Sequence, residues 1–249
     1  MISKGYFWDK KGLLFGPDVP NFSHASHPAI VHVRDNLHLI AFSARDSKQR
    51  SHIFLCYAEV ADSKIELVGE PQLALGLGDP GHFDSEGLLC CCFVKYHSIC
   101  YLYYCGWQNL PEGLWFCDTG RAIVNVDKLT AEREYLGPVL GRDKNNPLFA
   151  VATAVHVTSK ELWRTWYNSG IKWEKKNDEW LPRYGIHYGH SKNGIDWVCE
   201  PGLIIPFRDE YEHSFGRPTV AYWDEQFCMW FAHRGTKDYS TYRIGFATS

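Results

Sequence analysis

The sequence predicts an all-β protein built as a β-propeller, and three observations lead to this fold class. The 249 residues include 10 Trp, 14 Tyr and 14 Phe, residue types that favour strands. Short apolar stretches alternate with polar turns, and no long segment keeps the 3.6-residue period of a helix. One pattern also recurs about every 63 residues along the chain.

Four segments carry this repeat. Each begins with an apolar strand, continues through a polar turn such as Arg34-Asp35-Asn36, and ends in a strand rich in aromatic residues. The segments are HPAIVHVRDNLHLIAFSARD, LLCCCFVKYHSICYLYYCGW, VATAVHVTSKELWRTWYNSG and GRPTVAYWDEQFCMWFAHRG. Their matched aromatic residues, at spacings of 62, 63 and 64, are Phe42, Tyr104, Tyr167 and Phe231. A third strand follows in SHIFLCYAEV, RYGIHYGHSKNGIDW and YRIGFATS, whereas GLWFCDTGRAIV is less regular.

Repeated antiparallel sheets of this length are typical of propeller blades. A β-sandwich is the rival fold, but it does not explain the period. We therefore expect one domain over residues 1–249, with repeats at about 24–80, 81–143, 144–207 and 208–249. Residues 1–23 are expected to add a strand that closes or caps the ring.

Composition excludes several classes of function. The net charge is −3, and no long basic run is present, which argues against a nucleic-acid partner. No stretch of about 18 apolar residues suggests a membrane span, and the first residues lack the apolar core of a secretory signal. Nine cysteines without a CxxC motif indicate free thiols and a cytoplasmic location.

The blade pattern resembles that of the five-bladed propeller superfamily of glycoside hydrolases, which includes family 43, the invertase-like families and family 130. The segment YGIHYGHSKNGIDW resembles its recurrent blade signature. The chain is most similar to uncharacterised propellers from bacterial surface-polysaccharide gene clusters. Such proteins usually continue for a further blade after RIGFATS, so the last blade is expected to be incomplete or missing here. A homo-oligomer or a partner chain would then complete the ring.

Four carboxylates are the catalytic candidates. Glycoside hydrolysis needs two carboxyl groups that flank the scissile bond, and the starts of the inner strands of a propeller converge on one channel mouth. This reasoning selects Asp84 as the base or pKa-setting carboxylate, Glu212 as the acid, and Glu86 and Asp46 as further candidates. Each of them also fits a structural partner of an arginine.

The same convergence nominates the substrate-binding residues His24, His27, Arg45, Thr153, Arg217, His233, Arg234 and Trp107. Histidine at position 27 stands where family 43 and invertase-like enzymes place an aspartate, and it suits a general base or a partner for a sugar hydroxyl. The family 130 pattern compares better with His27-Pro28 and Ala44-Arg45-Asp46, and this resemblance implies phosphate as an attacking group. Arg45, Arg217, His233 and Arg234 would suit such an anion.

Three functions therefore compete. The first is a carbohydrate-active, glycoside hydrolase-like enzyme acting on a small glycan. The second is a non-catalytic sugar-binding or scaffold propeller in polysaccharide biosynthesis, and the third is a phosphorylase or transferase that uses phosphate or an activated sugar. No cofactor or metal is required, although the resemblance permits a channel ion such as calcium. Cys90, Cys91 and Cys92 are expected to pack as small apolar residues in an inner strand.

Overall fold

The computed structural model describes residues 12–14, 16, 21–62, 64–176, 178–235 and 241–249. Within these ranges the protein is almost entirely β-structure, and the only helix is a short 3₁₀ turn, η1 (Pro111–Gly113). The described part of the chain contains no helix that is long and apolar enough to cross a membrane. The predicted all-β class is confirmed. The strand predicted over residues 1–23 lies largely outside the described residues.

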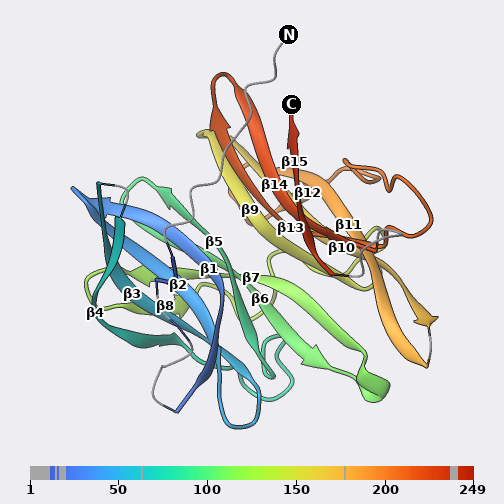
Figure 1. The fold of residues 1–249 in the computed structure, drawn as a ribbon, viewed down its shortest axis with the longest axis horizontal. Coiled ribbons are helices and arrows are strands. Elements are labelled where there is room, and N and C mark those ends of the chain that lie inside the picture. Colours follow the sequence, from blue (N-terminus) through green and yellow to red (C-terminus); the bar gives the residue numbers. More distant parts are fainter. Residues whose placement is uncertain (1–11, 15, 17–20, 63, 177, 236–240) are drawn as a thin grey trace.

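The described strands form four antiparallel groups (Figure 1). Group 1 contains β1 (Ser23–Arg34), β2 (Leu37–Arg45), β3 (Ser51–Ala61) and β4 (Lys64–Leu75). Group 2 contains β5 (Leu88–Tyr96), β6 (Ile99–Asn109), β7 (Trp115–Asn125) and β8 (Thr130–Arg133). Group 3 contains β9 (Phe149–Ser159), β10 (Leu162–Lys176), β11 (Glu179–Ser191) and β12 (Trp197–Cys199). Group 4 contains β13 (Ser214–Trp223), β14 (Gln226–Arg234) and β15 (Arg243–Thr248).

The first strand of each group faces the middle of the molecule, and we call β1, β5, β9 and β13 the inner strands. They contact one another in chain order, β1 with β5, β5 with β9, and β9 with β13. Figure 1 shows groups 1 and 2 on one side and groups 3 and 4 on the other. Short parallel pairings also join neighbouring groups, where Cys117 of β7 meets Phe149 of β9 and Tyr184 of β11 meets Ser214 of β13.

Tight turns connect the strands inside each group. Arg34 pairs with Leu37 across a two-residue loop in which Asp35 has φ 45°. At the equivalent place in group 4, Asp224 and Glu225 have φ 53° and 60°. Positive φ at such positions gives the turn a twist that matches the right-handed twist of the strands. The segment GLWFCDTGRAIV, irregular in sequence, nevertheless forms most of the long strand β7.

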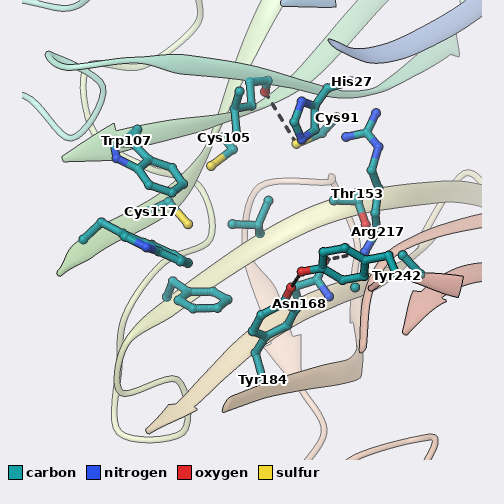
Figure 2. Close-up of a pocket in the computed structure, with 16 residues that line it drawn as sticks. His27, Cys91, Cys105, Trp107, Cys117, Thr153, Asn168, Tyr184, Arg217 and Tyr242 are labelled. Carbon is teal, nitrogen blue, oxygen red and sulfur yellow. Dashed lines mark hydrogen bonds between the residues drawn. The ribbon is translucent and has the colours of Figure 1, made fainter. Parts of the chain in front are cut away.

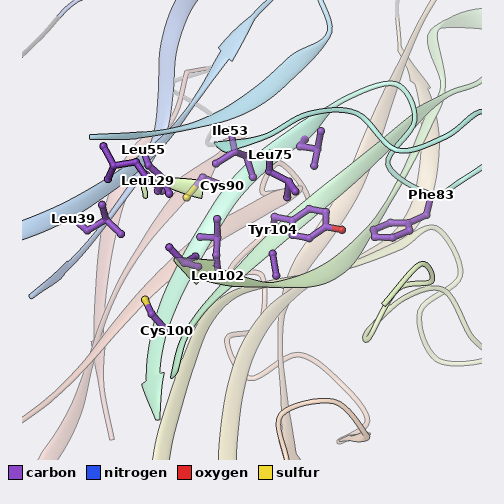
Figure 3. Packing of buried hydrophobic residues seen from close by; sticks show 14 residues of the cluster. Leu39, Ile53, Leu55, Leu75, Phe83, Cys90, Cys100, Leu102, Tyr104 and Leu129 are labelled. Carbon is purple, nitrogen blue, oxygen red and sulfur yellow. The ribbon is translucent and has the colours of Figure 1, made fainter. Parts of the chain in front are cut away.

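The core lies between neighbouring groups. Leu39, Ile53 and Leu55 of group 1 pack against Leu88 and Leu102 of group 2 (Figure 3). Groups 2 and 3 meet at Tyr103, Phe149 and Trp163, and groups 3 and 4 meet at Trp166, Ile186, Phe215 and Met229. Three of the matched aromatic residues are fully or almost fully buried, namely Phe42, Tyr104 and Tyr167. This face-to-face packing of successive sheets gives the chain a propeller-like architecture.

Candidate functional site

A cavity of about 420 Å³ opens where the inner strands meet. We call it the axial cavity (Figure 2). All four inner strands contribute to its lining, through His27 of β1, Cys91 of β5, Thr153 of β9 and Arg217 of β13. The remaining lining residues come from β5, β6, β7, β9, β10, β11, β13, β14 and the segment before β15. Its volume lies within the range of small-molecule sites.

Each inner strand carries a one-residue β-bulge at its cavity-lining residue. Ser26 pairs with Ser43 and Ala29 with Ala41, so two residues of β1 oppose Phe42 alone. The pairing of β5, β9 and β13 shifts in the same way around Cys91, Thr153 and Arg217. Bulges redirect side chains and are frequent beside functional sites. The repeat thus presents four different side chains at one level of the cavity.

Two of these bulges hold their residue in the left-handed region. His27 has φ 55° and Arg217 has φ 49°, and a proline follows each of them. Such backbone is uncommon for residues other than glycine and costs about 1–3 kcal/mol where it persists. Proline suits the next position because it lacks the N–H that a regular ladder would use. The strain therefore coincides with two side chains that line the cavity.

Arg217 spans from β13 to two other inner strands. Its Nη1 donates to the Cys90 carbonyl at 3.0 Å, and its Nη2 donates to the Pro28 carbonyl at 3.2 Å. Both acceptors are neutral oxygens, and no carboxylate among the described residues forms an ion pair with this guanidinium. Arg217, Thr153 and Cys91 also line a second cavity of about 430 Å³. The two cavities therefore adjoin at the bulge residues.

Asn168 of β10 fixes the backbone of the Arg217 bulge. Its Oδ1 accepts the Arg217 N–H at 3.0 Å, and its Nδ2 donates to the Phe215 carbonyl at 2.9 Å. The side chain is 7% exposed, so water supplies little alternative hydrogen bonding. One amide side chain thereby replaces the ladder bonds that the bulge interrupts.

His27 is neutral at pH 7. Burial, together with the smaller effects of the positive charges of Arg217 and Arg45, lowers the pKa of its imidazole to about 4. Ser26 Oγ donates its single proton to the Ser43 carbonyl at 3.3 Å, so it accepts from His27 Nδ1 at 3.1 Å. This hydrogen-bond pattern assigns the proton to Nδ1 and leaves Nε2 as an acceptor.

An aromatic wall forms one side of the axial cavity. Trp107 of β6 stacks on Trp115 of β7 at 4.4 Å between ring centroids, and Trp115 stacks on Phe149 of β9 at 5.0 Å. Tyr184 contacts Phe149 edge-on, and its hydroxyl is hydrogen-bonded to that of Tyr242. The stacked rings therefore form a continuous apolar surface along the cavity, with hydroxyl groups at one end (Figure 2).

Three thiols, those of Cys91, Cys105 and Cys117, also line the axial cavity. All nine cysteines are free. Burial raises the pKa of the Cys91 thiol well above its ordinary value, and interaction with Cys117 together with burial does the same for Cys105. These two thiols are therefore protonated at neutral pH and poorly suited to nucleophilic catalysis.

The lining does not suit a calcium ion. Calcium takes six to eight oxygen ligands and favours carboxylates, whereas the described lining contains no carboxylate and carries the Arg217 cation. No group of three or more His, Cys, Asp or Glu side chains in the described part of the chain is arranged to hold a metal.

Asp84 lies in a buried ion pair rather than in the lining of the axial cavity. Its side chain is fully buried, and its Oδ2 accepts from Arg133 Nε at 2.7 Å and from the Tyr104 hydroxyl at 3.0 Å. A Cβ placed on Gly78 would lie 2.0 Å from its Oδ1, so the backbone packs directly against the carboxylate. These contacts join β6 and β8 to the loop before β5.

The other three predicted carboxylates also have protein partners, and none of them is in the described lining. Glu212 accepts the Arg208 N–H at 2.6 Å and is 5% exposed. Glu86 accepts the N–H of Asn109, two residues beyond Trp107. Burial opposes ionisation of Asp46, but hydrogen bonds from Arg50 and His52 outweigh it and lower the carboxyl pKa to about 2.

Among the predicted binding residues, the cavity brings together His27, Thr153, Arg217 and Trp107. Arg45 is exposed at the end of β2, near enough to His27 to affect its pKa. His24 is exposed and hydrogen-bonds Ser23. His233 packs on Phe215 and Phe231, and the Arg234 guanidinium lies 4.7 Å from the centre of the Tyr242 ring.

Sequence reasoning missed several residues of the cavity, namely Asn168, Trp115, Phe149, Tyr184, Cys105 and Cys117. A signal existed for Asn168, which directly follows the matched aromatic Tyr167. A signal existed for Trp115 as well, since it begins the third strand of its repeat. The other four residues, Phe149, Tyr184, Cys105 and Cys117, line the cavity because of how neighbouring groups pack together, which the local sequence does not indicate.

Comparison with known proteins gives three results. No family model matches the chain. In sequence, the chain is 29% identical over 247 residues to uncharacterised proteins of two Mycobacterium tuberculosis strains, covering 97% of this chain and 79% of theirs. In structure, it resembles an α-L-arabinanase of Cellvibrio cellulosa, with TM-score 0.64, 11% identity, and coverage of 91% of this chain and 74% of that chain.

A second solved structure gives the same result. It is an exo-1,5-α-L-arabinanase from a bovine ruminal metagenomic library, with TM-score 0.63, 14% identity, and coverage of 92% of this chain and 75% of the other. At this level of identity the likeness concerns the fold. The protein therefore has the propeller-like all-β fold found in these arabinanases.

Proposed function

We propose that the protein is a carbohydrate-active propeller that binds a glycan in the axial cavity. One observation carries this proposal: a stacked aromatic wall faces a set of polar side chains across a single cavity of about 420 Å³. Aromatic rings bury the apolar faces of a ligand, and a few placed polar groups fix its orientation. Sugars offer both kinds of surface.

The polar side of the cavity suits hydroxyl groups. His27 Nε2 accepts a hydroxyl proton when Nδ1 carries its own, and Thr153 Oγ1 keeps lone pairs free after donating to the Pro218 carbonyl at 3.3 Å. Trp107 and Trp115 supply apolar aromatic surface in the lining. The likeness in fold to arabinanases, whose names state an action on glycans, supports the same class of ligand.

The finer architecture is part of the proposal. The four antiparallel groups fit repeats at about 24–80, 81–143, 144–207 and 208–249 within a ring of the five-bladed type. A ring of that type has room for one more blade than the described residues form, and association with a second copy or a partner chain is part of the same proposal because exposed sheet edges favour pairing.

Glycoside hydrolysis is the second candidate function, and the fold likeness favours it. It would need two carboxyl groups on either side of the scissile bond. Glu86 is the best placed of Asp84, Glu86, Glu212 and Asp46, because its N–H donates to the Trp107 carbonyl beside the aromatic wall. Substituting each carboxylate by its amide and measuring release of reducing sugar tests this function. Turnover that survives all four substitutions would contradict it.

Titration calorimetry with neutral and acidic oligosaccharides tests glycan binding. Alanine at Trp107 or Trp115 should weaken binding about tenfold or more, because each substitution removes aromatic surface from the cavity lining and disrupts the ring stack. Alanine at Trp223, which is 59% exposed on the β13–β14 turn, should leave the affinity unchanged. Equal affinities for all three variants and the unaltered protein would place the glycan elsewhere.

A further inference from the structure

We propose that Arg217 forms an acidic subsite, and that the glycan bound in the axial cavity carries a negatively charged group at this end. This inference rests on the proposed function and specifies its class of ligand. The shared chemistry is an anionic oxygen pair, as in the carboxylate of a uronic acid or in a sulfate or phosphate ester.

The charge balance of Arg217 sets it apart from other arginines of the fold. Arg121 pairs with Glu134 at 2.6 Å, Arg133 with Asp84 at 2.7 Å, and Arg142 with Asp118 at 3.2 Å. Arg217 instead donates to two backbone carbonyls. Half-buried charges are normally neutralised by a partner. The positive charge at the cavity is thus matched by no carboxylate of the described residues.

The guanidinium is also held ready for a ligand. It has five N–H donors, and the carbonyls of Cys90 and Pro28 occupy one donor on each terminal nitrogen. Three N–H groups therefore remain. Because Asn168 fixes the bulge and the two carbonyls fix the fork, little side-chain entropy is lost when an anion binds. A fixed fork favours carboxylate, sulfate and phosphate over neutral oxygens.

The surroundings favour an anion over a cation. The charged groups acting on His27, which lies beside Arg217, are Arg217 itself and Arg45, both positive. The rest of the described lining is apolar, thiol, amide or hydroxyl. A negative group beside Arg217 would meet no like charge from the described lining.

The first test uses the unaltered protein. Glucuronate and galacturonate are compared with their methyl esters by protein-observed NMR, since esterification removes the charge and keeps the sugar. At low ionic strength the acids should bind about tenfold tighter or more, and they should shift the Arg217 Nε–H resonance. Added salt should reduce the preference. Glucose 6-sulfate and glucose 6-phosphate are tested in the same way, as anionic sulfate and phosphate esters. Their affinities show which anionic group binds best.

The second test uses variants. Arg217→Gln should abolish the preference for the uronic acid over its methyl ester. The affinity for the neutral methyl ester should change by no more than about threefold. Arg34→Gln, an exposed arginine at the far end of β1, should keep the preference. Equal binding of every anionic ligand and its neutral counterpart to the unaltered protein would overturn the inference and leave glycan binding intact. Binding of no sugar, acidic or neutral, would overturn the proposed function as well.

Discussion

At the scale of single residues, charged side chains inside the fold have two kinds of partner: an opposite charge or a neutral carbonyl oxygen. Asp84 and Arg133 neutralise each other at 2.7 Å inside the protein, whereas Arg217 faces a cavity with only carbonyl partners. The first arrangement stabilises the sheets. The second leaves a positive charge that a ligand can neutralise. The charged residue best placed to bind a ligand is therefore Arg217, a cation, rather than one of the predicted carboxylates.

His27 should stay neutral well into the acidic range. Burial, followed by the charges of Arg217 and Arg45, lowers its pKa from 6.5 to about 4. An NMR titration of its ring protons should give a midpoint near that value. Arg217→Gln should raise the midpoint only in part, because burial is the larger cause. A midpoint near 6.5 in the unaltered protein would contradict this view of the site.

The same depressed pKa of His27 has a consequence for stability. In the unfolded chain the imidazole takes up a proton near pH 6.5, whereas in the folded protein it does so near pH 4. The unfolded state therefore binds more protons between these values, and the free energy of unfolding falls as the pH drops from 6.5 towards 4. His27→Gln should show a weaker loss of stability over this window.

Asp84→Asn should destabilise the protein by about 3–5 kcal/mol, because it leaves Arg133 with an uncompensated charge. Urea unfolding measures the change. Replacing both partners, as in Asp84→Leu with Arg133→Met, should cost less than Asp84→Asn alone. A singly substituted Asp84→Asn protein that unfolds at the same urea concentration as the original would show that the ion pair is unimportant, and would favour a role for Asp84 in catalysis.

At the scale of elements, the bulged inner strand is the unit that builds the site. Four strands with similar patterns each place their bulge residue in the cavity lining. The repeat therefore fixes the positions of these four residues, and the residue type at each position decides its chemistry. The bulge in β13 depends on a neighbour in another group, because Asn168 of β10 holds both Phe215 and Arg217. The site is therefore coupled to the packing of group 3 against group 4.

Asn168→Ala should lower the free energy of unfolding by about 2 kcal/mol, because two buried backbone groups lose their partner. It should also weaken binding of uronic acids several-fold while Arg217 itself is unchanged. Thermal unfolding and calorimetry measure the two effects. If uronic acid affinity is unaffected in a folded Asn168→Ala protein, Asn168 does not position Arg217.

The sequence was informative where its repeat was regular. Matched aromatic residues such as Phe42 and Tyr167 mark second strands, and the same register brought His27, Thr153 and Arg217 to the list of binding candidates. It was less informative about partners that come from other repeats. Nothing local to Asp84 indicates that Arg133, 49 residues away, approaches its carboxylate. A strict two-residue alternation also fails at Cys91, where the bulge adds a residue.

At the scale of the whole molecule, the axial cavity exists only because four groups meet. The aromatic wall comes from groups 2 and 3, with Tyr242 from the segment before β15, whereas the charged and polar side comes from groups 1, 3 and 4. A glycan held between them would contact both sides at once. Ligand binding should therefore stabilise the packing between groups as well as occupy a pocket.

A crystal structure with a uronic acid-containing oligosaccharide tests the central claim most directly. We expect one sugar ring against Trp107 and Trp115, with its carboxylate within hydrogen-bonding distance of the Arg217 guanidinium. A glycan bound on another surface, with the axial cavity free of sugar, would contradict it.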